Sequence, residues 1–404
     1  MSLDEQLNAT LQRLTAAVEG LAEKSGKPKL SFSLDQLLSV MVKHRGTFLH
    51  LNGGSFPMLR INHELVPVGE HAISPRECQA LLSQVLNQEH LLALARGMEV
   101  GFGYAMDGAG FRFHVYQERG LLGASIRRIR TDIPPLAQLG LSGSVLEQLL
   151  DQRQGLILLV GRPRCGKINS FASLISHLNE QQRVRVVTLE SPIQFWHESK
   201  KATVVQREVG VDTETYVHGI RQAVLQDPDI LAVGELPDPD TVEVVIQAAA
   251  GGHLVLAMLD APSAVRAVDQ IVEVFYNNND NRMLRLFSRV LKLVVCQYLV
   301  PRADGRGKLP AFEILECNEE VADCIGRGET SSLHEAMRQA NMQTLGRHLS
   351  RMVDVGLVNR EEAGKLLDDP SELTVMEEQP EMALSQAATP SILMDDDSPL
   401  MSWL

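Results

Sequence analysis

The chain has 404 residues, 44% hydrophobic and 22% charged, which is the composition of a globular protein with room for two or three domains. Its net charge of −13 is unevenly placed, because the stretch from Leu366 onward holds nine acidic residues and no Lys or Arg. The remainder is therefore near −4, which argues against a general nucleic-acid surface.

The five cysteines form no metal-ligand pattern, and their odd number suits a reducing compartment. The start, MSLDEQLNATLQ, lacks the basic and apolar regions of a signal peptide. No apolar run approaches the roughly 20 residues needed to span a bilayer. We therefore predict a cytoplasmic protein with no bound metal and no direct membrane insertion.

Residues 1–31 are predicted to form an N-terminal helix and a linker. Over residues 1–23 apolar residues recur at alternating four- and three-residue spacing, which is a heptad seam. This seam packs either on its own domain or on a partner helix, and the sequence leaves both open. Residues 24–31, KSGKPKLS, have the composition of a linker.

Residues 32–140 are predicted to form a small antiparallel sheet with helices. Residues 47–68 alternate like a strand, a turn at Gly53 and Gly54, and a second strand. Residues 73–95 have helical periodicity after a Ser-Pro start. Residues 111–129 return to alternation, as expected of paired strands.

Residues 141–280 are predicted to form a parallel, helix-covered sheet, because short apolar strands alternate with helices. Residues 281–366 are expected to be largely helical. The acidic segment 367–404 is predicted to be disordered. The expected strands are 155–160, 184–190, 202–209, 229–235 and 253–259, and the expected helices are 170–179, 241–252 and 263–275.

The stretch GRPRCGKINS, residues 161–170, follows the apolar run LILLV and has the glycine and lysine spacing of a phosphate-binding loop. In such a loop, backbone N–H groups and a helix N-terminus converge on an anion, and the lysine adds charge at the outer phosphates. The spacing alone would arise by chance in roughly one chain in ten. The preceding strand, the following helix and the surrounding parallel-sheet pattern strengthen the prediction.

Glu235 ends the apolar run DILAVGE, where P-loop enzymes carry the carboxylate that organises Mg²⁺ or the attacking water. A surface Glu at a strand end is the alternative. The run alone does not decide between them.

From about residue 35 to 366 the sequence resembles the type IV pilus retraction ATPases, PilT and its paralogue PilU, within the secretion-ATPase family. VVTLESPIQFWHESKK (186–201) is similar to their Asp box, and RQAVLQDPDILAVGELPDPDT (221–241) to their Walker B region. AAAGGHLVLAMLDAPSAVRAVDQIVEVF (248–275) resembles their His box. FLHLNGGSFPMLRIN (48–62) and FRFHVYQERG (111–120) resemble their N-terminal domain.

The resemblance implies an α/β protein in which a PAS-like α+β domain precedes a RecA-like P-loop ATPase domain with a helical C-terminal part. It further implies ATP as ligand, a homo- or hetero-hexameric ring with PilT-like ATPases, and contact with the inner-membrane platform protein of the pilus. Glu190 and Glu235 become the predicted catalytic residues. The predicted nucleotide contacts are Gly161, Arg162, Pro163, Arg164, Cys165, Gly166, Lys167, Ile168 and Asn169, with Arg112, Arg119 and Arg127 of the first domain and His253.

Several active-site positions depart from the family pattern. In the loop, Arg164 stands for a Gly, Cys165 for a Ser, and Ile168 for the Ser or Thr that ligates Mg²⁺. The Asp box has Ser191 where the family has Asp, and the His box has Asp260 where the family has a phosphate-facing His. Bound Mg²⁺ is therefore doubtful, since Ile168 offers no ligand and Asn169 is turned away by about 100° along the helix.

Asp260 places negative charge beside the phosphates, and we expect it to oppose both binding and catalysis. Arg162 and Arg164 would partly compensate for missing Mg²⁺ charge, although the Cβ of Arg164 disturbs the loop if its φ is positive. A lowered pKa with a redox role is one expectation for Cys165, which lies beside a helix N-terminus, and a plain loop thiol is the favoured alternative. Two hypotheses result: a nucleotide-binding ring subunit with weak or absent hydrolysis that modulates retraction, and a working retraction motor with a nonstandard metal shell.

Overall fold

The computed structural model describes residues 32–61, 64–140, 151–277, 280–367 and 369–373. The chain divides into two compact units, Met1–Thr131 and Asp132–Leu404. The sequence predicted a boundary between residues 140 and 141, somewhat later in the chain. The predicted N-terminal helix, the heptad seam and the linker lie outside the described residues.

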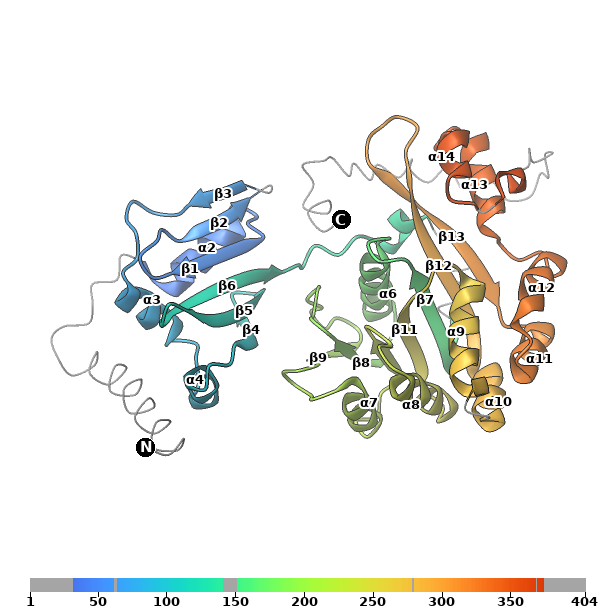
Figure 1. The fold of residues 1–404 in the computed structure, drawn as a ribbon, viewed down its shortest axis with the longest axis horizontal. Helices are drawn as coiled ribbons and strands as arrows, with labels where there is room; N and C mark the ends of the chain where they lie inside the picture. The colour runs from blue at the N-terminus through green and yellow to red at the C-terminus, as the bar shows by residue number, and fades with distance from the viewer. Residues whose placement is uncertain (1–31, 62–63, 141–150, 278–279, 368, 374–404) are drawn as a thin grey trace. The chain divides into compact units, whose positions relative to one another are not determined.

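Among the described residues of the first unit, strands form one antiparallel sheet with helices against it (Figure 1). The strands are β1 (Phe48–Asn52), β2 (Met58–Ile61), β3 (Glu64–Pro67), β4 (Val100–Met106), β5 (Ala109–Glu118) and β6 (Leu121–Ile129). Their order is β3-β2-β1-β6-β5-β4. Helix α2 (Leu34–Lys43) contributes four buried residues to the core of this unit. The predicted antiparallel sheet with helices is confirmed, with three strands rather than two over residues 47–68.

The helix predicted over residues 73–95 is two helices, α3 (Pro75–Leu82) and α4 (Gln88–Ala95). Each has its own N-cap. The Ser74 side chain accepts a hydrogen bond from the backbone N–H of Glu77, and the Asn87 side chain accepts one from that of His90 at 2.8 Å. The second cap restarts the helix and explains the break, which hydrophobic spacing alone did not reveal.

The second unit is built on a sheet that is parallel apart from one edge strand. Its strands are β7 (Gly155–Gly161), β8 (Arg185–Glu190), β9 (Thr203–Glu208), β10 (Ile230–Val233), β11 (Leu254–Asp260), β12 (Leu291–Pro301) and β13 (Lys308–Glu316). In the described residues their order is β13-β12-β7-β11-β10-β8-β9, and β13 pairs antiparallel with β12. The strands expected at 155–160, 184–190, 202–209, 229–235 and 253–259 are all present.

Helices cover both faces of this sheet (Figure 1). All seven residues of β7 are buried, and they alternate between two cores. Leu158 points into the core shared with α7 (Tyr216–Val224), α8 (Pro239–Ala250), α9 (Ala264–Asn277) and α10 (Asn281–Val290). Ile157 points into the core shared with α6 (Lys167–Gln181). Burial on both faces explains why β7 reads as a continuous apolar run.

The prediction that residues 281–366 are largely helical is wrong for their middle part. Residues 291–301 and 308–316 are the strands β12 and β13 of the main sheet. A run such as LKLVVCQYLV fits a buried helix or a buried strand equally well by hydrophobicity, and its β-branched residues were the missed signal. Helices follow the strands: α11 (Glu319–Arg327), α12 (Leu333–Gln339), α13 (Leu345–Asp354) and α14 (Arg360–Gly364).

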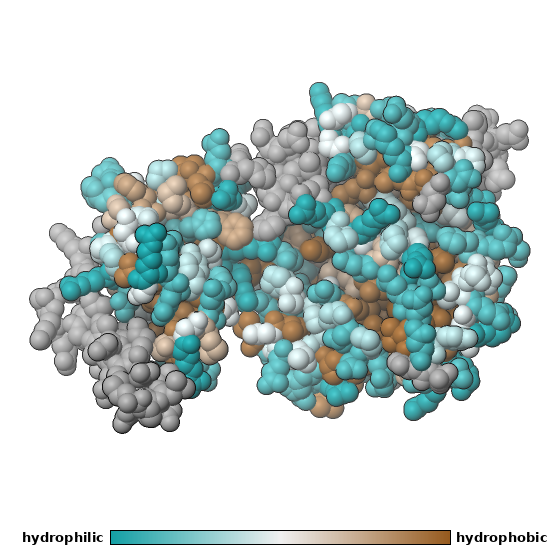
Figure 2. Space-filling model, viewed as in Figure 1, coloured by the Kyte–Doolittle hydropathy of each residue, from teal (hydrophilic) through white to brown (hydrophobic). Residues whose placement is uncertain are grey.

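The segment predicted to be disordered from residue 367 begins with ordered structure. Pro370–Glu372 forms a short 3-10 helix, and Leu373 is buried against the core that contains Leu349. Residues 374–404 lie outside the described part. Within the described chain no helix has the length and apolarity to cross a membrane. The face drawn in Figure 2 is largely hydrophilic, with scattered hydrophobic residues.

Candidate functional site

The loop 161–166 joins the end of β7 to the start of α6 and is held against β12. Gly161 has φ 155° and Gly166 has φ 88°, values that favour glycine. A Cβ on Gly161 would lie 2.6 Å from the backbone oxygen of Gln297, so this position also lacks room for a side chain. The glycine spacing found in the sequence therefore has a direct structural cause.

Arg164 has φ 66°, in the left-handed region that costs a non-glycine residue roughly 1–2 kcal/mol. The sequence raised this possibility because the family carries Gly here. The positive φ is a conformation that a glycine would adopt without this strain.

The N-terminus of α6 can accept an anion. Its N-cap is Gly166, which provides no side-chain hydrogen bond, and its first turn contains no acidic residue. The first N–H groups of a helix have no partner within the helix, and the helix dipole favours negative charge there. These are features expected of a phosphate cradle, and the contact of the loop with a nucleotide stays a prediction.

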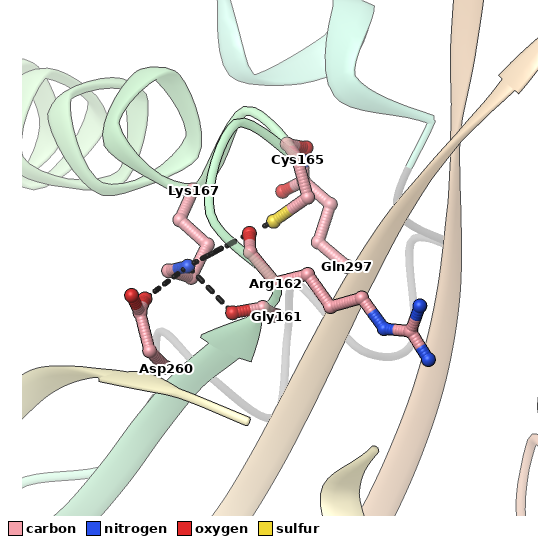
Figure 3. A network of polar contacts seen from close by, with 6 residues as sticks. All are labelled: Gly161, Arg162, Cys165, Lys167, Asp260 and Gln297. Atoms are coloured by element: carbon pink, nitrogen blue, oxygen red, sulfur yellow. Dashed lines mark hydrogen bonds and ion pairs between the residues drawn. The ribbon is translucent and has the colours of Figure 1, made fainter. Parts of the chain in front are cut away.

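Lys167 is directed at the protein itself (Figure 3). Its Nζ lies 2.6 Å from Gly161 O, 3.1 Å from Arg162 O and 2.6 Å from Asp260 Oδ1. The Lys167 side chain is 10% exposed and that of Asp260 is 63% exposed. Asp260 reaches the lysine because it ends β11 directly opposite Gly161 in the parallel register. The ammonium charge is therefore already paired with a carboxylate.

The residues present do not fit Mg²⁺. Ile168, which stands where the metal-ligating hydroxyl is expected, is exposed and has no donor atom. Across the described residues, no group of three or more His, Cys, Asp or Glu side chains is placed to hold a metal ion. Mg²⁺ binding by this chain stays an open prediction.

The expected lowering of the Cys165 pKa is wrong. The thiol is buried, and burial raises its pKa, which outweighs the opposing influence of Lys167. Desolvation disfavours the thiolate more than the nearby helix N-terminus and ammonium group favour it. Cys165 is therefore a packed loop thiol and not an activated one.

The two predicted catalytic carboxylates lie on the same edge of the sheet as the loop. Glu235 follows β10 and is exposed, and Glu190 ends β8 and is buried. Neighbouring strands lie about 4.8 Å apart, and β10 and β8 are the second and third strands from β7. The backbones of Glu235 and Glu190 are therefore roughly 10 and 14 Å from the end of β7. Burial raises the pKa of Glu190, although the Thr188 hydroxyl at 2.7 Å and the Gln206 amide at 3.1 Å donate to its carboxylate.

The structure does not bring His253 to the loop, and its contact with a nucleotide stays a prediction. His253 precedes β11, whereas the loop lies beside the other end of that strand, about 20 Å away. Its Nδ1 lies 2.7 Å from Pro228 O and donates, because a carbonyl oxygen only accepts. The His box spans the whole strand, so its two ends lie at opposite edges of the sheet.

The predicted arginines of the first unit occupy β5, β6 and the turn between them. Arg112 and Arg127 are directly opposite each other in the antiparallel register. Arg119 lies in the turn with φ 53° and an exposed side chain. Their contact with a nucleotide stays a prediction.

The proposed compensation by loop arginines is not supported for Arg162. Its guanidinium points away from Lys167 and Asp260 in Figure 3. Pro163 and Arg164 are exposed, and Asn169 is half-buried.

Two residues near the site were missed by sequence analysis. Gln297 of β12 donates from Nε2 to Cys165 O at 2.9 Å and accepts from the Ser170 hydroxyl at 2.5 Å, which ties the loop to α6 and the sheet. A lone Gln within an apolar run was its sequence signal.

Tyr216 has a buried hydroxyl without a hydrogen-bond partner in the described residues. Burial raises its pKa, and the charges of Glu235 and Glu190 add to the effect.

A helix-covered parallel sheet with a phosphate-type loop after β7 and carboxylates along the same edge defines a P-loop ATPase-type domain of the RecA-like kind. The sequence profile of the family "Type II/IV secretion system protein" matches residues 125–365. The structure of Legionella pneumophila ATPase DotB has the same fold, with a TM-score of 0.72 at 21% identity, over 85% of this chain and 97% of that one.

More similar proteins narrow the family. The type IV pilus ATPase PilU of Pseudomonas aeruginosa is 31% identical over 85% of this chain and 90% of its own length. The retraction ATPase PilT of the same organism is 30% identical over 82% and 96%. A crystal structure of the pilus retraction motor PilT with bound ADP aligns with a TM-score of 0.75 at 30% identity, covering 86% of this chain and all of that one. The chain belongs to the PilT/PilU-like type IV pilus ATPase family, as its motifs indicated.

Proposed function

We propose that the chain is a nucleotide-binding ring subunit of the type IV pilus machinery, with weak or absent ATP hydrolysis, which supports or regulates pilus retraction. The observation that carries the proposal is the pairing of Lys167 with Asp260, whose Oδ1 lies 2.6 Å from Nζ. Phosphoryl transfer is catalysed mainly by neutralising charge on the transferred phosphate. A loop lysine whose charge is already balanced contributes little to that task.

Nucleotide binding itself is supported by the backbone of the loop. The N-cap of α6 makes no side-chain hydrogen bond, so backbone N–H groups of the first turn can donate to a phosphate. Gly161 and Gly166 have no side chains that would block a phosphate from the backbone. ATP is the ligand that the family resemblance implies, and a related PilT structure contains ADP. Ile168 removes the usual Mg²⁺ ligand, so binding without the metal is part of the proposal.

The assembly that we propose is a homo- or hetero-hexamer with PilT-like ATPases in the cytoplasm, bound to the inner-membrane platform protein of the pilus. The relatives that support it are the type IV pilus ATPases PilU and PilT, which this chain matches over most of its length. A subunit without effective hydrolysis would act by joining a ring with an active motor. Nucleic acid is not among the expected partners.

One observation favours the alternative of an active retraction motor. Glu190 and Glu235 are both retained on the sheet edge that carries the loop. A carboxylate in that place can orient an attacking water. The alternative requires that Lys167 leave Asp260 when ATP binds.

Phosphate release with ATP and Mg²⁺ separates the two hypotheses. We expect the wild-type protein and the Glu235→Gln variant to release phosphate at the same near-background rate, because the loop limits turnover before the carboxylate acts. A motor-like rate in the wild type that is lost in Glu235→Gln would contradict the proposal.

Assembly is tested by native mass spectrometry of the tagged chain co-expressed with a PilT-type ATPase. Rings that contain both proteins support a modulating subunit. Separate rings of each protein, with or without nucleotide, would contradict the hetero-hexamer and a role inside the ring of an active motor.

A further inference from the structure

We propose that Asp260 makes the loop select nucleoside diphosphates over nucleoside triphosphates. The inference rests on the proposed nucleotide binding and assigns a specificity to the same site.

The hydrogen-bonding capacity of Lys167 is fully used within the protein. An ammonium group has three donors, and Nζ of Lys167 has three oxygen partners: Gly161 O, Arg162 O and Asp260 Oδ1 (Figure 3). An incoming phosphate gains a donor from Lys167 only by displacing one of them. Gly161 O and Arg162 O belong to the loop backbone, so Asp260, with a side chain that is 63% exposed, is the partner that can move.

The inner and outer phosphates of a nucleotide depend on different parts of such a loop. Backbone N–H groups hold the inner phosphates, whereas the lysine reaches the second and third phosphates and a Ser or Thr hydroxyl ligates the metal. In this chain the backbone cradle is present at the start of α6. The parts that would serve a third phosphate are missing, since Lys167 is paired and Ile168 offers no metal ligand.

The charges around the outer position also disfavour a third phosphate. Asp260 stands beside Lys167, and Glu235 follows on the next strand along the same edge. The guanidinium of Arg162 points away from this position (Figure 3). A third phosphate would bring more negative charge next to Asp260 than a diphosphate does, and Lys167 is already paired there.

The test is equilibrium binding of ADP and of the slowly hydrolysed analogue ATPγS to the full-length protein in EDTA. We expect ADP to bind roughly tenfold or more tightly than ATPγS, since the additional phosphate of ATPγS places more negative charge against Asp260. In Asp260→Asn the affinity for ATPγS should rise roughly tenfold, with a smaller change for ADP, because the amide keeps the shape and removes the charge.

Asp304→Asn is the matched control. Asp304 is an exposed aspartate paired with a cation, as Asp260 is, and its Oδ2 lies 2.8 Å from Nη2 of Arg302 in the turn between β12 and β13. Its substitution changes net charge by the same amount, and we expect it to leave the ratio of the two affinities unchanged.

The outcomes separate this inference from the proposed function. Equal affinities for ADP and ATPγS, unaltered by Asp260→Asn, would overturn the selectivity and leave nucleotide binding standing. Failure of both ligands to bind the wild type and Asp260→Asn, with thermal unfolding as in the wild type, would overturn the proposed function together with the inference. A change of the affinity ratio in Asp304→Asn equal to that in Asp260→Asn would reduce the effect to net charge and overturn the local role of Asp260.

Discussion

Strand β7 and the loop that follows it are adjacent in the chain, but the side chains of β7 are buried whereas most of those in the loop are exposed. Every residue of β7 is buried, and its side chains fill two cores that the sheet shares with helices on both faces. In the loop and the first turn of α6, Arg162, Pro163, Arg164 and Ile168 are exposed. The residues that depart from the family pattern lie there and at Ser191 and Asp260. The fold therefore persists through packing, while the chemistry at the sheet edge can change without loss of the scaffold.

The largest expected effect tests this difference in stability. Leu158→Ala removes a fully buried side chain, and we expect a loss of about 2–5 kcal/mol in the free energy of unfolding of the second unit, measured by urea denaturation. Ile168→Ala changes an exposed residue, and its effect should remain within about 0.5 kcal/mol. Similar losses for the two variants would contradict the separation of scaffold and loop.

A buried histidine far from the loop gives the next prediction. Burial lowers the pKa of His348 to about 4, and its Nδ1 accepts the backbone N–H of Phe312 at 2.9 Å, which requires the neutral ring. This pKa is lower in the folded state than in the unfolded state, so folding favours the neutral ring. The contribution of neutral His348 to the stability of the fold is therefore complete above the unfolded pKa of 6.5 and is lost as pH falls toward 4.

Between pH 6.5 and pH 4, His348 should lower the free energy of unfolding by up to about 1.4 kcal/mol for each unit by which the pH falls. His348→Gln should remove this slope, measured as the difference in unfolding free energy from the wild type at pH 7 and pH 5. The exposed His71 is the control, and His71→Gln should leave the slope unchanged. Parallel pH profiles for the wild type and His348→Gln would show that His348 is not held neutral by the scaffold.

A smaller effect is expected in the loop. Arg164→Gly relieves the left-handed strain but adds freedom to the unfolded chain, so we expect a net gain of about 0.5–1 kcal/mol. Arg162→Gly is the control, since Arg162 is not in the left-handed region and should lose about the same amount. Thermal unfolding midpoints measure both. A loss in both variants would mean that Arg164 makes contacts that outweigh its backbone strain.

The sequence predicted the strands of the parallel sheet well because their apolar runs are buried on both faces, as in β7 and β11. It misjudged β12 because a buried strand and a buried helix have similar hydrophobicity. The loop was predictable from its glycines, whose conformations are local.

The ion pair between Lys167 and Asp260 was not predictable in the same way, because it depends on the register of β7 with β11. For the same reason His253, assigned by motif, lies at the edge of the sheet opposite the loop. The Cys165 pKa depended on burial, which the helix-terminus argument did not include. Register and burial are properties of the folded chain, so these features needed the structure.

The central claim is that the loop binds the phosphates of a nucleotide through its backbone and that this binding does not require Mg²⁺. It is tested most directly by the dissociation constant of ADP for the wild-type protein, measured by calorimetry in EDTA and again with saturating Mg²⁺. Because Ile168 offers no ligand, we predict binding under both conditions, with constants that differ by less than about twofold. Binding that appears only with Mg²⁺, or that Mg²⁺ tightens tenfold or more, would contradict the account.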